Sequence, residues 1–361
     1  MGITEKFCVF CGEEPKNKNK EHVLPQWLIE LTGDPKRVVN FGMNPVTGDI
    51  PRFDWSSLVF PSCKRCNDRY SSLENNVKGL VIKLVAREPI RATEYVQVFD
   101  WLDKVRIGLW LGYSYLHKNP SRISPTFHID SRVGQKDRMI AIYTLDTRPE
   151  GLNAYGAETL CFSLQPSCFS LKINNIYILN MSWDYMCSAR YGFPFPKTAI
   201  IDLDAATPYK LQCSDYATTH KVKHPVMRKT FIKPSIHLYQ PIIESPLSIA
   251  DFADDEWLRK KIVPGSDRKG VVHRQWDDRV EVIENPASTI ENDEVKGRHT
   301  RRLGEIVAQT YELQLKTYLT FEFRSKDKER MTENKKLDKL VRQQNNISKN
   351  AFLEAANPKN P

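Results

Sequence analysis

Two Cys-x-x-Cys pairs, Cys8/Cys11 and Cys63/Cys66, have the spacing that most clearly suits chemistry in this chain. Each two-residue spacer lets both sulfurs face one ion, and four thiolates suit tetrahedral zinc at about 2.3 Å. The long segment between the pairs must then fold so that it brings them together. Such a zinc has no open position and would be structural; accidental pairing or a redox-active pair is the alternative.

A Glu-His pair, Glu21 and His22, stands between the two cysteine pairs in "KNKEHVLPQWL". Pro25 follows three residues later and disfavours a helix there, so we expect an extended strand. Neighbouring side chains on a strand point to opposite faces. Glu21 could therefore be a metal ligand or part of a salt bridge. His22 could be a general base, a structural histidine or a further zinc ligand.

Composition indicates a globular protein with a preference for polyanions. The chain has 361 residues, 53 basic against 44 acidic side chains, and a net charge of +9, which favours partners such as nucleic acid. There is no signal-peptide pattern and no apolar run of about 18 to 20 residues, so a cytoplasmic, soluble protein is expected. The four scattered cysteines are expected to be buried apolar residues; they are Cys161, Cys168, Cys187 and Cys213.

The elements that must position these residues lie on both sides of the second cysteine pair. Residues 1–62 are rich in Gly and Pro and have a small apolar content, so a metal would help to stabilise them. From Asn67, apolar residues recur every three or four positions and predict an amphipathic helix. The expected order is strand, cysteine knuckle, helix.

The remaining sequence predicts a larger mixed α+β domain. A strongly apolar helix over 96–118 would be its spine, with strands expected at "MIAIYTL", "TLCFSL", "FSLKINNIYILNMSW" and "KTAIIDL". We expect four parts: a zinc-knuckle domain (1–85), the α+β domain (86–245), a connector with a helix (246–323) and a basic polar tail (324–361). The tail is expected to be a solvated helix or disordered.

The segments "CVFCGE", "EHVLPQWL" and "CKRCNDRYSSLE" together resemble the zinc-stabilised branch of the HNH endonucleases, in the ββα-metal superfamily. The resemblance covers residues 5–80. It implies an α+β fold class in which a small zinc-stabilised ββα-metal domain precedes the larger domain and the tail. It also implies that the four cysteines bind structural zinc.

By the same resemblance, His22 matches the general base, and Asn67 matches a ligand of a catalytic Mg²⁺ or Mn²⁺ ion. Glu21 matches an acidic residue that reaches this ion in some members. Ser57 stands where the family usually has Asn, which leaves Asn40 or Asn44 as the alternatives for orienting His22. Asn67 could alternatively be a helix N-cap. Glu74 lies roughly 10 Å further along the helix and could support the site or be solvated.

The expected function is a metal-dependent endonuclease, a hydrolase of nucleic-acid phosphodiester bonds, with double-stranded DNA as substrate. Lys64, Arg65, Arg69 and the tail would contact phosphates. The resemblance suggests a bacterial or phage setting such as phage defence. Separately, the second domain is a candidate site for binding a protein partner. The alternative is a non-catalytic zinc-knuckle module that binds nucleic acid or a partner protein.

Two further groups of residues, a pair of histidines and a run of aromatics, could form binding sites, but a place on the surface or in the core is the simpler interpretation of each. His220 and His224 are four residues apart and could bind metal on a helix, but their segment is basic and contains Pro. The aromatics of 183–196 could stack on bases, although a core or a turn is the more common use of such residues.

Overall fold

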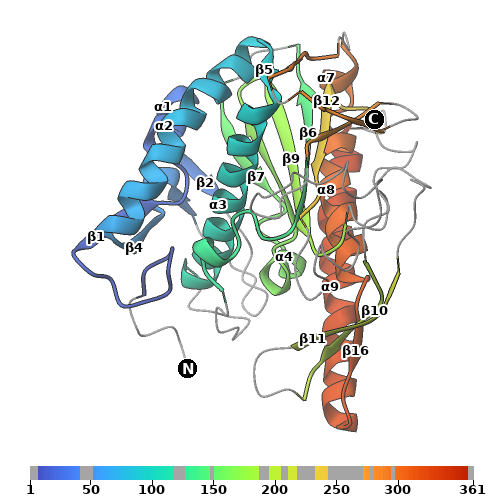
Figure 1. Cartoon of the computed structure of the whole chain (residues 1–361). Helices are drawn as coiled ribbons and strands as arrows, with labels where there is room; N and C mark the ends of the chain where they lie inside the picture. Colours follow the sequence, from blue (N-terminus) through green and yellow to red (C-terminus); the bar gives the residue numbers. More distant parts are fainter. Residues whose placement is uncertain are drawn as a thin grey trace.

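The structure of the chain is a computed structural model, and it shows an α+β protein of helices and antiparallel sheets (Figure 1). The residues that it describes are 7–40, 52–116, 127–146, 150–186, 195–204, 210–217, 232–242, 271–276, 280–285, 287–293 and 297–356.

The N-terminal part is built on a two-stranded antiparallel sheet followed by a helix. We call this sheet the hairpin, although a long segment joins its two strands. Strand β1 (Lys18–His22) pairs antiparallel with β4 (Val59–Cys63), with Lys18 opposite Cys63 and His22 opposite Val59. Helix α2 (Lys64–Ala86) begins immediately after β4. The expected order of strand, cysteine knuckle and helix is thus confirmed. The intervening elements are α1 (Gln26–Leu31), β2 (Val38–Asn40), β3 (Arg52–Asp54) and the 3-10 turn η1 (Trp55–Ser57).

Helix α2 buries the apolar face that its sequence predicts. Its buried side chains recur at three- and four-residue steps, which is the spacing of one helix face; they are Tyr70, Val77, Leu80, Val81 and Leu84. Removal of this stripe from water stabilises α2 against the hairpin and the next helix.

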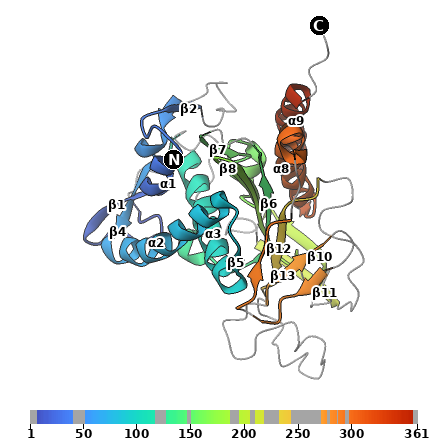
Figure 2. The same cartoon turned by 90° about the horizontal axis from the view of Figure 1, so that it is seen from above.

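Helix α3 (Ala92–Leu116) lies between the hairpin and the main sheet (Figure 2). Its described side chains, over residues 92–112, are mostly buried, as expected for the spine of the molecule. Short strand β5 (Ile90–Arg91) precedes it and pairs with β15 (Thr289–Ile290). One hydrophobic core runs from the hairpin through α3 to the sheet, so the N-terminal part and the following part share a single core.

The main sheet has seven antiparallel strands and separates two layers of helix. Alternate residues of β6 serve the two faces: Ile140 and Ile142 join the core around α3, whereas Met139, Ala141 and Tyr143 join the core around α8 (Leu303–Tyr318). In spatial order the strands are β14 (Val280–Val282), β13 (His273–Gln275), β12 (Ile236–Gln240), β6 (Asp137–Thr144), β9 (Ile176–Trp183), β8 (Cys168–Ile173) and β7 (Leu152–Tyr155).

The segment "TLCFSL" was expected to be a strand, and that prediction is wrong. It forms the short helix α4 (Leu160–Leu164), whose N-cap Thr159 accepts a hydrogen bond from the Phe162 N–H at 3.0 Å. A short apolar run does not distinguish a buried helix from a strand, and here the side-chain cap favours the helix. The "KTAIIDL" strand is confirmed as part of β10 (Phe195–Asp202), which pairs with β11 (Lys210–Ala217) and β16 (Glu322–Arg324).

The C-terminal helices cover the second face of the sheet. Helix α8 was predicted from its sequence and is confirmed. Helix α9 (Lys328–Ala356) packs beside it and occupies most of the basic tail. The shorter elements are the 3-10 turn η2 (Ile129–Ser131) and helix α7 (Arg298–Arg301). Among the described residues, no helix has both the length and the apolar character needed to cross a bilayer.

Gly108 on α3 tests the packing of that helix, and Gly79 on the exposed side of α2 is the control. A Cβ atom at Gly108 would lie 3.1 Å from a methyl of Val23, whereas one at Gly79 would meet no atom within 4 Å. Gly108→Leu should lower the free energy of unfolding by about 1 to 3 kcal/mol through overpacking. Gly79→Ala should raise it by about 0.5 to 1 kcal/mol, because alanine favours a helix. Urea unfolding measures both; an unchanged Gly108→Leu midpoint would contradict close packing of α3 on the hairpin.

Candidate metal centre and the adjoining histidine

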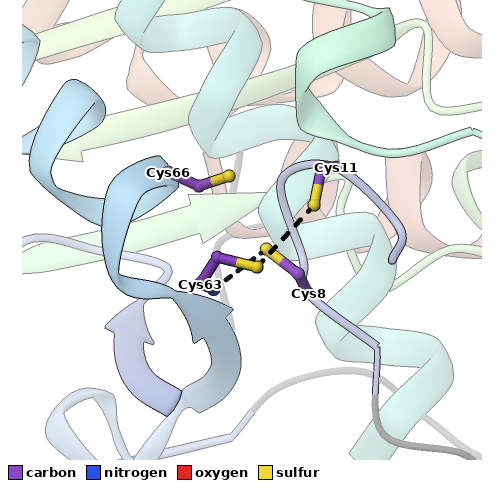
Figure 3. Close-up of side chains that lie close together, drawn as sticks. All are labelled: Cys8, Cys11, Cys63 and Cys66. Atoms are coloured by element: carbon purple, nitrogen blue, oxygen red, sulfur yellow. Dashed lines mark hydrogen bonds between the residues drawn. The ribbon is translucent and has the colours of Figure 1, made fainter. Parts of the chain in front are cut away.

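Four cysteine sulfurs converge at the end of the hairpin (Figure 3). The Sγ atoms of Cys8, Cys11, Cys63 and Cys66 all lie within 4.8 Å of one another. Cys8 and Cys11 come from the N-terminal turn, Cys63 ends β4, and Cys66 lies in the first turn of α2. The hairpin therefore brings together two pairs that are far apart in the sequence, as a zinc site requires.

Backbone N–H groups point at the sulfurs, as expected for thiolates that bind a metal. The Cys63 N–H donates to Cys8 Sγ at 3.2 Å, and the Lys16 N–H donates to Cys63 Sγ at 3.2 Å. Such bonds stabilise negative sulfur. Gly12 follows the first knuckle with φ +79°, where a Cβ would lie 2.4 Å from the His128 ring. The turn that presents Cys8 and Cys11 thus depends on a glycine.

The sulfurs repel one another when no cation balances their charge. Burial and the charges of Cys8 and Cys11 raise the pKa of Cys66 to about 12. Burial would also raise the pKa of Cys8, but backbone donors including the Cys11 and Cys63 N–H groups bring it below its ordinary value. A bound cation removes this repulsion and deprotonates the thiols. Four sulfurs that lie within 4.8 Å of one another fit tetrahedral zinc, and a zinc bound by all four would have no open position for water.

His22 occupies the end of β1 on an accessible face of the strand. Alternation along β1 places His22 on the same face as Lys18 and Lys20, which are both exposed, while His22 is half-buried. Glu21 points to the opposite face and is buried. The two lysines are residues that our sequence analysis did not single out. The order Lys18, Asn19, Lys20, Glu21, His22 could have indicated this, because alternate residues of a strand lie on one face.

Glu21 is engaged in a buried cluster of charges. Its carboxylate and that of Glu74 on α2 both contact the ammonium of Lys104 on α3. The Lys104 side chain is only 1% exposed. The salt bridge considered for Glu21 is therefore present, and Glu74 is neither solvated nor isolated. This Glu21–Lys104–Glu74 cluster joins β1, α2 and α3.

The cluster is electrostatically unbalanced, since two carboxylates share one ammonium. Burial raises the pKa of Glu21 and of Glu74, and Lys104 lowers both values in part. Burial would lower the pKa of Lys104, but the two carboxylates raise it above its usual value.

The residues expected to hold a catalytic divalent ion are only partly free to do so. Asn67 is the fourth residue of α2 and is half-buried; the N-cap is Cys63, so Asn67 does not have that role. Glu21 offers its carboxylate to Lys104 instead of to an open site. Within the described part of the chain, the four cysteines are the only group of three or more His, Cys, Asp or Glu side chains placed to share an ion.

The side chain of Ser57 makes a local hydrogen bond. Its hydroxyl donates to the backbone carbonyl of Asp54 at 2.8 Å, within η1. Asn44 and the side chain of Asn40, the suggested substitutes, lie outside the described residues. So do His220, His224, Cys187 and part of the aromatic segment 183–196. Cys213 lies on β11, and its side chain is also outside the described part. Cys161 and Cys168 are buried, as expected.

Two of the three basic residues expected to contact phosphate already have acidic neighbours. Lys64 pairs with Asp68 at 2.7 Å, and Arg69 pairs with Asp130. Arg65 is exposed near the start of α2. Exposed ion pairs are weak, so a phosphate could replace these carboxylates at modest cost. The face that carries Lys18 and Lys20 is an additional basic surface next to His22.

Comparisons with known proteins give no match: no family model, no curated protein and no solved structure matches this chain.

We expect one zinc per chain, bound by the four cysteines. Cys66→Ser should lose the metal and lower the melting temperature, because structural zinc contributes folding free energy directly. Cys161→Ala removes a buried sulfur outside the cluster and should retain the zinc. Elemental analysis of the purified chains measures the stoichiometry. Zinc retained at full stoichiometry in Cys66→Ser would contradict a four-sulfur site.

We expect Lys104 to be critical for stability. Lys104→Met leaves two carboxylates buried without a cation, which should cost about 3 to 5 kcal/mol near neutral pH. Because their pKa values are raised by burial, the folded variant gains from protonating them. That gain is present at low pH and is lost as the pH rises through the folded pKa values. The destabilisation, measured by urea unfolding, should therefore be smaller at about pH 5 than at about pH 7.5.

Lys78, an exposed residue of α2, provides the control for this experiment. Lys78→Met removes the same charge from α2 without uncovering a buried carboxylate, and it should change stability little. Equal effects of the two substitutions at both pH values would show that the buried cluster has no special energetic role.

Proposed function

We propose that the chain is an endonuclease that hydrolyses phosphodiester bonds of DNA, with His22 as the general base. The observation that carries the proposal is the position of His22. It is half-exposed at the end of a strand face that bears Lys18 and Lys20, on a hairpin held by the cysteine cluster. The hairpin–helix order agrees with the ββα resemblance of the sequence.

The chemistry requires a base near a bound phosphate. His22, if neutral, takes a proton from water while the water oxygen forms a bond to phosphorus and the bond to the leaving oxygen breaks. Lys18 and Lys20 would attract the phosphodiester backbone and neutralise part of its charge. Phosphate contacts of this kind position a duplex without reading its sequence. The family resemblance implies that cleavage needs a divalent ion, and the comparison of Mg²⁺, Mn²⁺ and EDTA below tests this.

A second candidate function is supported by two contacts. Glu21 is bound to Lys104, and the Ser57 hydroxyl is bound to Asp54, so two groups that would assist an HNH active site are engaged elsewhere. A zinc-knuckle module that binds nucleic acid without cutting it would keep the same basic face. Such a module would not need His22 as a general base.

Cleavage of supercoiled plasmid in Mg²⁺, Mn²⁺ or EDTA distinguishes the two candidates. Wild type should nick or linearise the plasmid, and His22→Ala should reduce the rate by on the order of 100-fold or more. Asn67→Ala should also reduce it if Asn67 holds a catalytic ion. Asn19→Ala and Asn76→Ala, at exposed positions of β1 and α2, serve as matched controls.

Binding is measured separately on the same variants. Lys18→Ala with Lys20→Ala should weaken DNA binding and reduce the dependence of log affinity on log salt concentration by about one unit per lysine. Salt-sensitive binding without cleavage in any metal condition would establish the binding module. Cleavage unaffected by His22→Ala would refute the assignment of the base.

A further inference from the structure

A cavity of about 790 Å³ lies between β2, the edge strand β7 and helix α9. Its volume is in the range of small-molecule binding sites, roughly 300 to 1,000 Å³. None of the residues to which the proposed nuclease chemistry is assigned lines it, so it is a separate feature of the described part of the chain.

Aromatic rings form much of its wall, contributed by Trp55, Tyr155, Tyr311 and Phe352. The Phe352 ring stands perpendicular to that of Tyr155, with centroids 5.4 Å apart, and nearly parallel to that of Tyr311, at 5.7 Å. Three of the large apolar side chains that line the cavity remain largely in water: Val38 is 66% exposed, Ile347 is 62% exposed and Leu340 is 46% exposed. An apolar ligand body would cover such surface.

One carboxylate stands in this aromatic setting. Glu158 lines the cavity, and no basic residue does among the described residues that form the wall. Tyr311 donates its hydroxyl proton to Oε1 of Glu158 at 2.6 Å, whereas the buried Oε2 has no hydrogen-bond partner among the atoms of the described residues. Burial raises the pKa of the Glu158 carboxyl. An ionised carboxylate here lacks a compensating charge, which is costly in an apolar setting.

The loop that carries Glu158 is held by a network of side-chain amides. Gly156 has φ +83°, and its carbonyl accepts from Gln314 Nε2 at 2.7 Å. Thr159 donates to Gln314 Oε1 at 3.0 Å, and the Leu160 N–H donates to Gln344 of α9 at 2.8 Å. These bonds fix the loop to both C-terminal helices. The carboxylate is therefore preorganised, which reduces the ordering cost of binding.

We infer that this cavity binds an organic cation that has an aromatic or apolar body. The ammonium or guanidinium would pair with Glu158, and the body would lie against the aromatic wall. Cations are attracted to the faces of aromatic rings, and an ion pair gains strength where water is excluded. The absence of basic side chains from the described wall disfavours an anionic ligand. The inference is independent of the proposed nuclease function.

Tryptamine and its neutral counterpart tryptophol provide a matched pair of probes. Titration calorimetry on the full chain should show binding of tryptamine and at least about tenfold weaker binding of tryptophol. Glu158→Gln keeps the shape of the site and removes the charge. It should weaken tryptamine binding about tenfold or more and leave tryptophol binding unchanged. Glu312→Gln, at a half-buried position of α8 where the carboxylate pairs with Lys316 outside the cavity wall, should change neither.

A second variant locates the site without touching the carboxylate. Ala351 is an exposed residue of α9 that lines the cavity, so Ala351→Trp should fill it and weaken tryptamine binding without lowering the melting temperature. Equal affinities of the two probes for wild type, or no tryptamine binding at millimolar concentration, would overturn the inference. So would unchanged tryptamine affinity in Ala351→Trp.

Discussion

The shared ammonium of Lys104 is the interaction on which the arrangement of the N-terminal half depends. It contacts Glu21 on β1 and Glu74 on α2 while it belongs to α3. A buried charge without its partner is far more costly than a missing apolar contact. The three elements must therefore assemble with nearly one geometry. Since His22 is adjacent to Glu21, the same requirement fixes the strand that presents the imidazole.

A second buried network on α3 has a similar effect on the sheet. Asp103 pairs with Arg106 at 2.7 Å and with Arg138 of β6 at 3.1 Å, and all three side chains are almost fully buried. Helix α3 thus forms buried ion pairs on both sides: Lys104 pairs with a carboxylate of the hairpin, and Asp103 pairs with an arginine of the sheet. Apolar packing holds α3 in place, while the paired charges restrict its rotation and register.

Local patterns predicted the parts of the site that depend on nearby residues. The Cys-x-x-Cys spacing indicated the convergence of four sulfurs, and Pro25 indicated that Glu21 and His22 lie on a strand. The partner of Glu21 could not be read from the sequence, because Lys104 is distant along the chain and any acidic residue could have met it. The available hint was a lysine within an otherwise apolar helix, where an unpaired charge is not tolerated.

The contrast between local patterns and contacts of distant residues also explains which elements of the fold were predicted correctly. Alternation in β6 and the apolar face of α2 are strong signals, since each repeats over many residues. The run around Cys161 is too short to show a period, and its helix is decided by the cap at Thr159 and by contacts with α9. The cavity beside Glu158 depends on how α9 lies against β7. Such a relation between distant elements has no local signature.

The continuous core also bears on how this protein can change in evolution. Val9 and Trp55 near the N-terminus belong to the same buried cluster as Ile178 in the sheet and Ile290 beyond it. Gly108 and Gly112 leave room on α3 for Val23 and Phe60, so the facing surfaces are matched at the level of single methyl and ring groups. Recombination that exchanged only the cysteine-bearing part would place foreign side chains against this helix. The two parts are therefore expected to be inherited together, with compensating substitutions on both sides of the boundary.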